Sequence, residues 1–190
     1  LFAHPLFALF MLCSALLQTS HLVVYNYGTL HWRAAGVSDG VIGMLWATGV
    51  IAEVILFAAG ARFVDRLGPG RLFLAAAFAG VLRWTVLAYG TALPVLFAVQ
   101  TLHAFTFGAA HLAAMAFIGR AVPAHLSATA QSLHGSVALS VAAGITAPFL
   151  GYLYEAWGGG AFHAMTVFSI AGGACALLLM RRWDGGKIVV

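Results

Sequence analysis

Six long apolar segments, separated by short breaks, run through this 190-residue chain and leave few folds open to it. Each segment is 18 to 27 residues long, and about 20 residues of apolar α-helix span a bilayer. In lipid the backbone must satisfy its own hydrogen bonds, so each segment is predicted to be a helix. The expected spans are residues 6–30, 41–61, 72–89, 94–118, 128–154 and 162–180.

The composition supports a membrane protein. Hydrophobic residues make up 63% of the chain and charged residues 7%, whereas soluble domains have about 45–50% and about 25%. These values exclude a soluble globular domain, a disordered tail and a nucleic-acid binder. We therefore predict an all-α integral membrane protein, a single six-transmembrane-helix bundle over residues 1–190, with the lipid bilayer as a partner.

The distribution of charge predicts the orientation in the membrane. Seven basic residues lie in the breaks after the second and fourth segments or after the sixth: Arg62, Arg66, Arg71, Arg120, Arg181, Arg182 and Lys187. The opposite side has only Arg33. Basic residues concentrate on the cytoplasmic side, so both termini are expected to be cytoplasmic. The first segment has neither a basic leader nor a cleavage site, and we expect an interior or C-terminal piece of a longer protein.

Two charged residues lie inside predicted spans, Glu53 in the second and Arg83 in the third. At the helical rise per residue, Glu53 lies about 18 Å from the outer side, Arg83 about 10 Å and His103 about 14 Å. All three are therefore expected in one central slab. Ionisable groups at this depth are costly and mark function by default. The alternatives are a carboxylate that exchanges a proton beside a fixed cation, or an ion pair that only fixes helix packing.

Polar and aromatic residues recur at helical spacing on several segments. On the fourth segment Gln100, His103 and Phe107 share one face, with His111 turned about 80° further. Similar stripes are Gln18, His21 and Tyr25 on the first segment, and Gln131 with His134 on the fifth. Together they predict a wet central cavity, in which histidine would suit a proton path because it titrates near neutral pH. The aromatics Trp46, Trp84, Phe105 and Phe107 either line a pocket for an aromatic solute or pack as ordinary core.

Signatures of enzymes are missing from the sequence. It contains no nucleophile motif, phosphate loop or zinc pattern, and Gly68, Pro69 and Gly70 form a turn and not a nucleotide loop. We therefore expect a protein that is not an enzyme and has no cofactor or metal. An alternative is a membrane redox protein with haem held by paired histidines from the set His21, His103, His111 and His134.

Several local phrases resemble a known family. The break at Asp65 to Arg71 (DRLGPGR) resembles the loop signature of the major facilitator superfamily, although Ala61 stands where a glycine is usual. Further phrases are HWRAAG from His31, AEVI from Ala52, LRW from Leu82, LH from Leu102 and HLAAM from His111. Together they look like the C-terminal six-helix half of the phenylpropionate permease family, close to the lactose permease group.

The resemblance implies half of a twelve-helix fold that imports a small solute with a proton by alternating access. It implies a bacterial inner membrane protein, monomeric when complete, whose partner is its own N-terminal half. In the similar lactose permease, the matching helices carry a glutamate, an arginine and a histidine followed by a glutamate. Glu53 and Arg83 fit this order, but no acidic residue follows His103. Glu53 is therefore the first candidate for the proton carrier, and His103 the second.

The resemblance also implies an aromatic carboxylate such as 3-phenylpropionate as solute, with Arg83 as its anchor. The predicted proton-coupling residues are Glu53, Arg83 and His103. The predicted solute-binding residues are Arg83, Gln100, His103, Trp46, His21, Tyr25, Phe107 and His111, and the cytoplasmic loop motif is Asp65, Arg66, Gly68 and Arg71. The alternatives are a facilitator without proton coupling, a sugar or nucleoside symporter of the same fold, and a membrane scaffold without transport.

Overall fold

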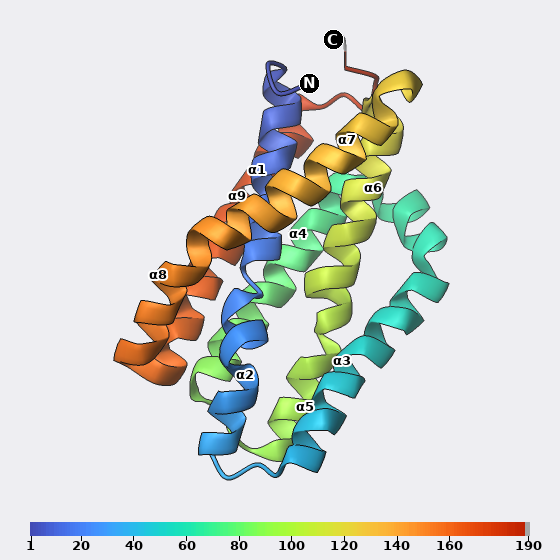
Figure 1. Cartoon of the computed structure of the whole chain (residues 1–190). Coiled ribbons are helices and arrows are strands. Elements are labelled where there is room, and N and C mark those ends of the chain that lie inside the picture. The colour runs from blue at the N-terminus through green and yellow to red at the C-terminus, as the bar shows by residue number, and fades with distance from the viewer. Residues whose placement is uncertain (189–190) are drawn as a thin grey trace.

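The computed structural model describes residues 1–188, and every regular element in that range is a helix (Figure 1). Two elements, η1 and η3, are π-helices, and η2 and η4 are 3-10 helices. The elements in chain order are α1 (Pro5–Thr19), α2 (Leu22–Ala34), α3 (Asp39–Ala58), α4 (Gly60–Tyr89), α5 (Leu93–Thr101), η1 (Ala104–Ala109), α6 (Ala110–Ala121), η2 (Ala124–Leu126), α7 (Ser127–Leu133), η3 (His134–Val141), α8 (Ala142–Trp157), η4 (Gly158–Ala161) and α9 (Phe162–Arg182).

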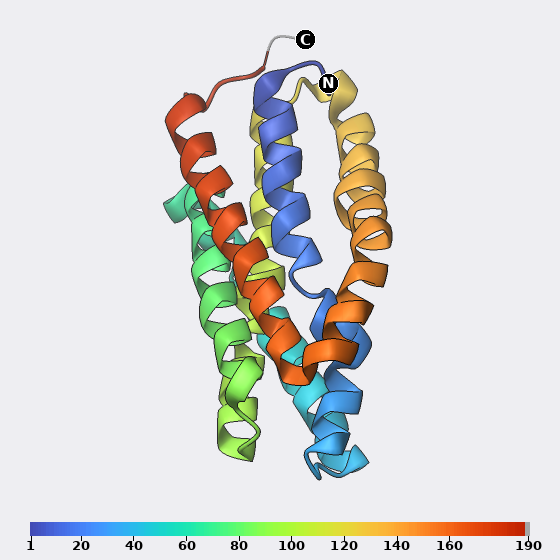
Figure 2. The ribbon, with the colours of Figure 1, turned by 90° about the vertical axis from the view of Figure 1, so that its left-hand side faces the viewer.

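Within residues 1–188, five helical stretches are long and apolar enough to cross a membrane: Pro5–Ala34, Asp39–Ala58, Gly60–Tyr89, Leu93–Ala121 and Ala124–Arg182. The last has 59 residues, far more than the roughly 20 that span a bilayer. Figure 2 shows it folding back at η4, so that α7 and α8 run antiparallel to α9. The start of α1 and the end of α9 lie at the same end of the bundle (Figures 1 and 2). The expectation of two cytoplasmic termini stays a prediction.

The first expected span, residues 6–30, is broken in the middle. α1 ends at Thr19 and α2 begins at Leu22, because side chains replace backbone donors at the break. The Ser20 hydroxyl donates to the carbonyl of Leu17 at 2.6 Å, and Nδ1 of His21 donates to the carbonyl of Gln18 at 3.2 Å. Side chains that bond nearby backbone in this way compete with the helix. α2 then continues to Ala34, into residues that were expected to be a loop.

The break expected at residues 62–71 is helical over most of its length. These residues belong to α4, which is interrupted only at Gly68, where φ is 71°. Glycine adopts this conformation without a steric penalty, and Pro69 follows it at a position where a helix tolerates a missing N–H. The guanidinium of Arg120 donates to the carbonyl of Val64 at 3.2 Å and ties the first part of α4 to the end of α6.

The fourth and fifth expected spans, residues 94–118 and 128–154, each contain a π-helix that the sequence did not predict. η1 follows His103, and η3 begins at His134. In a π-helix each N–H bonds one residue further back than in an α-helix, and such turns occur frequently at functional sites. The two histidines next to these turns are both buried.

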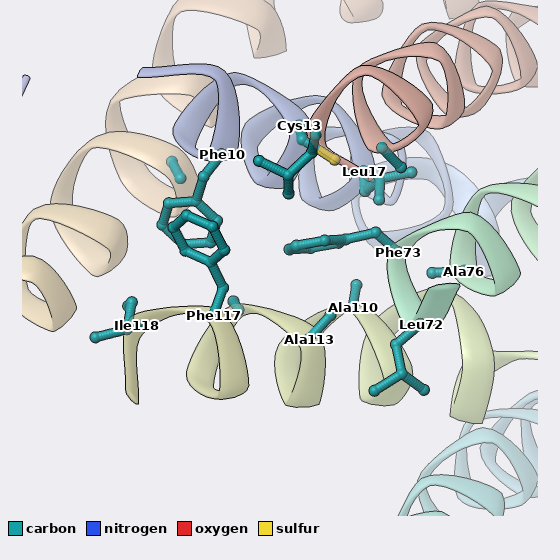
Figure 3. Close-up of a cluster of buried hydrophobic side chains, with 14 of the residues drawn as sticks. Phe10, Cys13, Leu17, Leu72, Phe73, Ala76, Ala110, Ala113, Phe117 and Ile118 are labelled. Atoms are coloured by element: carbon teal, nitrogen blue, oxygen red, sulfur yellow. The ribbon is translucent and has the colours of Figure 1, made fainter. Parts of the chain in front are cut away.

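Two apolar cores lie along the bundle and leave a polar layer between them. Figure 3 shows the first, in which Phe10, Phe73 and Phe117 meet from α1, α4 and α6. The second contains Trp84 together with further residues of α2, α3, α5 and α9. On α4 the first core ends at Ala77 and the second begins at Trp84, and Arg83 falls between them.

Candidate functional site

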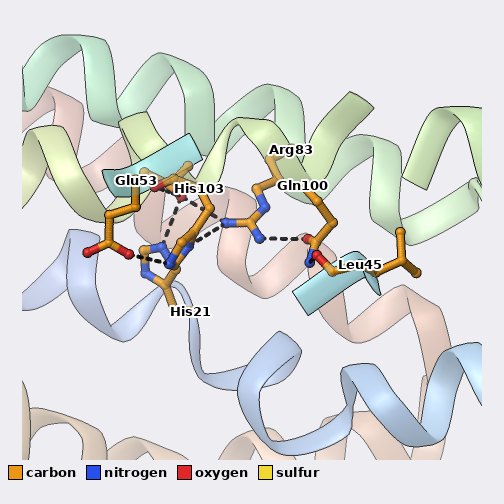
Figure 4. A network of polar contacts seen from close by, with 7 residues as sticks. His21, Leu45, Glu53, Arg83, Gln100 and His103 are labelled. Atoms are coloured by element: carbon orange, nitrogen blue, oxygen red, sulfur yellow. Dashed lines mark hydrogen bonds and ion pairs between the residues drawn. The ribbon is translucent and has the colours of Figure 1, made fainter. Parts of the chain in front are cut away.

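Arg83 is the centre of a buried polar network (Figure 4). Its side chain comes from α4 and is only 1% exposed. Nη2 donates to Oε1 of Gln100 at 2.7 Å, and Nη1 donates to Oγ1 of Thr106 at 2.9 Å and to Nδ1 of His103 at 3.2 Å. The guanidinium also lies 4.8 Å from the centre of the Trp84 ring. A cation in this position is held by neutral groups alone, which is an expensive arrangement in an apolar bundle.

His103 connects Arg83 to Glu53. Nε2 of His103 lies 3.2 Å from Oε2 of Glu53, a residue of α3. A guanidinium can only donate, so Nδ1 of His103 accepts from Arg83, and a neutral ring then carries its proton on Nε2. His103 therefore donates to Glu53 while it accepts from Arg83. The cation and the carboxylate are bridged by one imidazole and are not in direct contact within the described chain.

A second branch of the network reaches the break between α1 and α2. Nδ1 of His21 donates to the carbonyl of Gln18, so Nε2 of the neutral ring accepts from Oγ1 of Thr106 at 3.0 Å. His21 is fully buried, and Thr106 is 2% exposed. Thr106 thus accepts from Arg83 and donates to His21, and it joins three helices through one hydroxyl.

A cavity of about 170 Å³ opens beside the network. Its lining combines aromatic side chains with the polar groups already described: Tyr25, Trp46, Gly49, Val50, Arg83, Gln100 and His103. Gly49 permits the close approach of α3 to α5, since a Cβ there would lie 3.3 Å from Cβ of His103. An aromatic wall beside a buried cation is an arrangement that can hold an anion with an apolar body.

Most residues predicted for the site come together here. Glu53, Arg83, His103, Gln100, His21, Tyr25 and Trp46 belong to the network or to its cavity. Phe107 and His111 do not line that cavity. They continue from His103 as a stack of rings, with centroid distances of 5.4 Å and 6.2 Å. The ring planes of Phe107 and His111 are 4° from parallel.

The expected stripe on the fifth segment does not form. Gln131 is exposed and bonds Ser127 of its own helix, whereas His134 is buried and contacts Oγ of Ser14 at 2.7 Å. Thr106 was missed by the sequence reasoning, and its spacing of three residues from His103 was the available signal. Two of the four histidines of the haem alternative have no free nitrogen for a ligand bond, because both ring nitrogens of His21 and of His103 contact protein atoms.

The predicted loop motif lies elsewhere. Asp65, Arg66 and Arg71 are exposed, and none of them forms an ion pair with another described residue. A cavity of about 190 Å³ is lined by residues 67–71, by Leu179 and Met180 near the end of α9, and by Trp183 just after it. Gly68 and Arg71 line this cavity, so the motif lies beside the C-terminal end of α9 and not in the buried network.

Comparison with known proteins gives the family. The model of the MFS_1 like family matches residues 1–167. The chain belongs to this family of transporters. It is therefore a multi-pass membrane protein and not an enzyme, as the sequence predicted.

Three bacterial relatives support the MFS_1-like assignment. The chain is 37% identical over 161 residues to the probable 3-phenylpropionic acid transporter of Escherichia coli (strain K12), a match that covers 85% of this chain and 42% of the relative. It is 30% identical over 160 residues to the maltose permease of Geobacillus stearothermophilus, a match that covers 82% of this chain and 40% of that permease. The uncharacterized transporter YwbF of Bacillus subtilis (strain 168) is 23% identical over 182 residues, a match that covers 95% of this chain and 46% of YwbF. The chain thus spans less than half the length of these relatives.

Proposed function

We propose that this chain is the C-terminal six-helix half of a twelve-helix secondary transporter that imports a small organic anion together with a proton. The solute class that fits best is an aromatic carboxylate such as 3-phenylpropionate. The observation that carries the proposal is the Arg83 guanidinium, which is 1% exposed and which, within residues 1–188, bonds only the neutral side chains of Gln100, His103 and Thr106. A solute carboxylate would form charge-assisted hydrogen bonds directly with this cation, which none of these neutral partners can do.

The same network provides a physical basis for proton coupling. The charges of Arg83 and Glu53 cancel through the His103 bridge. A solute carboxylate on Arg83 adds one negative charge in surroundings of low polarity, where an uncompensated charge is costly. A proton on Glu53 returns the net charge of the site to zero, and the hydrogen bond from His103 to Glu53 is then no longer required. One proton therefore enters with each carboxylate, and Glu53 is the carrier.

The size of the cavity is consistent with a site that has a second wall. Its volume of about 170 Å³ is below the range of about 300–1,000 Å³ that is usual for pockets of small organic ligands. In transporters built from repeats, solute sites lie near the midplane between the repeats. We place the missing wall on the preceding half of the same protein, which would be a monomer in the inner membrane of a bacterium with both ends of this chain in the cytoplasm.

A sugar symporter is the second candidate, because the maltose permease matches 82% of this chain. Facilitation without a proton and a scaffold in which Glu53 and Arg83 only lock helices are further alternatives. Reversal of charge separates the scaffold from the transporter: Glu53→Arg combined with Arg83→Glu preserves a lock but removes the anion anchor from α4.

The proposal is tested by uptake of labelled 3-phenylpropionate into vesicles that contain the complete transporter, with and without an imposed pH gradient. Protein-free vesicles measure passive entry of the neutral acid, and an excess of unlabelled maltose tests the sugar alternative. In the parent, the gradient drives saturable uptake. Glu53→Gln loses this response but keeps exchange of internal for external solute.

Glu155→Gln is the matched control, because Glu155 is exposed near the end of α8, outside the network. It should behave like the parent. Saturable uptake that ignores the gradient in the parent would refute proton coupling, and a Glu53→Gln variant that still responds to the gradient would refute Glu53 as the carrier.

A further inference from the structure

The three nitrogens of the Arg83 guanidinium have unequal numbers of hydrogen-bond acceptors. Nη1 has two acceptors, Thr106 and His103, and Nη2 has one, Gln100. Nε is buried and has no hydrogen-bond partner among residues 1–188. The N–H groups of Nε and Nη2 point to the same edge of the planar group, and this edge matches the two oxygens of a carboxylate. One position on that edge is therefore taken by Gln100, and the other is unpaired.

Gln100 is itself firmly held. It is fully buried, and its Nε2 donates to the backbone carbonyl of Leu45 on α3 at 3.0 Å. The bond from Arg83 to Oε1, at 2.7 Å, polarises the amide and strengthens the donation to Leu45. Gln100 thus presents a neutral carbonyl oxygen to the guanidinium from a fixed position. Both residues line the same cavity, together with Tyr25 and Trp46.

We infer that Gln100 is a positioning residue that holds the Nε–Nη2 edge of Arg83 and competes with the solute carboxylate for Nη2. The inference rests on the proposed function, and it names the edge of Arg83 that receives the anion. When a carboxylate binds, one oxygen pairs with Nε and the other displaces Oε1 of Gln100 from Nη2. The amide of Gln100 therefore lowers the affinity of Arg83 for the anion and favours its release.

Competition predicts opposite effects for two substitutions of Gln100 in the complete transporter. Gln100→Leu removes the competing oxygen and leaves Nη2 unpaired, so KM for 3-phenylpropionate should fall about tenfold, the worth of one hydrogen bond to a charged group. Gln100→Glu places a permanent carboxylate on the same edge, and KM should rise at least about tenfold. If Gln100→Leu does not reach the membrane, Gln100→Met takes its place, because methionine keeps the length of the side chain, lacks the amide oxygen and should lower KM in the same way.

The matched control is Gln131→Leu, which removes an exposed glutamine on α7 whose amide donates to Ser127 of the same helix at 3.3 Å. Its KM should equal that of the parent. A merely structural role for Gln100 predicts the same direction for both substitutions, with KM unchanged or raised, and either result would overturn the inference.

Arg83→Gln separates this inference from the proposed function. If the parent lacks saturable uptake, or if Arg83→Gln retains it with the parent's KM, the proposed function fails whatever Gln100 does. If Arg83→Gln loses uptake while Gln100→Leu leaves KM unchanged or raises it, Arg83 remains the anchor and the role of Gln100 is wrong.

Discussion

Replacement of Thr106 by valine tests whether the buried network behaves as one unit. Valine has the shape of threonine but lacks the hydroxyl, so the change removes the acceptor of Arg83 Nη1 at 2.9 Å and the donor to His21 Nε2 at 3.0 Å. Thr106 is 2% exposed, and water has little access to replace either bond. The shape of the core is kept, and any loss of stability is therefore due to hydrogen bonding.

The expected magnitude follows from the two bonds. A hydrogen bond to a charged group contributes about 1.5–3 kcal/mol in soluble proteins and a neutral one about 1 kcal/mol. Interhelical hydrogen bonds in membranes average about 0.6 kcal/mol, with a maximum of about 1.7 kcal/mol, because the unfolded helices also find partners in the bilayer. Since one of the two bonds is charged and both are buried, we expect a loss of about 2 kcal/mol.

The assay is reversible unfolding of the purified complete transporter in mixed micelles. Thr101→Val is the control, because Thr101 is exposed on the same span and its hydroxyl donates to Ala98 of its own helix at 2.7 Å. Thr106→Ser keeps a hydroxyl and should restore most of the stability. A difference between Thr106→Val and Thr101→Val of less than about 0.5 kcal/mol, the range of ordinary surface substitutions, would refute the reasoning.

Two further predictions concern packing and surface charge. Gly80→Leu should destabilise the protein by about 1–3 kcal/mol, because even a Cβ at this position collides with Ser169 of α9. Gly43→Leu should be tolerated, since a Cβ there meets nothing within 4 Å. Equal unfolding midpoints of these two variants would contradict the close packing of α4 on α9. Arg33→Ala should change the free energy of unfolding by less than about 1 kcal/mol, because the 2.8 Å ion pair of Arg33 with Asp39 is solvent-exposed, the side chains being 55% and 74% exposed. A larger loss in the same unfolding assay would show that this pair holds the turn between α2 and α3.

The sequence alone determined the helical membrane class and predicted that the buried charged residues share one layer. Both depend on one-dimensional quantities, namely the length of apolar runs and the rise per residue of a helix. For that reason Glu53, Arg83 and His103 were expected in one layer, and the structure brings them together at hydrogen-bond distances. Tyr25 and Trp46 also reach the cavity that was expected there.

The tertiary structure decided which atoms meet. Arg83 bonds His103 and Gln100 and does not touch Glu53 directly, a choice that depends on where α3, α4 and α5 cross. The break before α2 and the π-turn after His103 were also invisible in the apolar pattern, because a π-turn keeps the helix apolar while changing its winding. The π-turn contains Thr106, which bonds Arg83, and Phe107, whose ring stacks on that of His111. The ends of an apolar segment and the helical rise estimate how far along a span a residue lies. Only the packing of neighbouring helices fixes which partner its side chain faces.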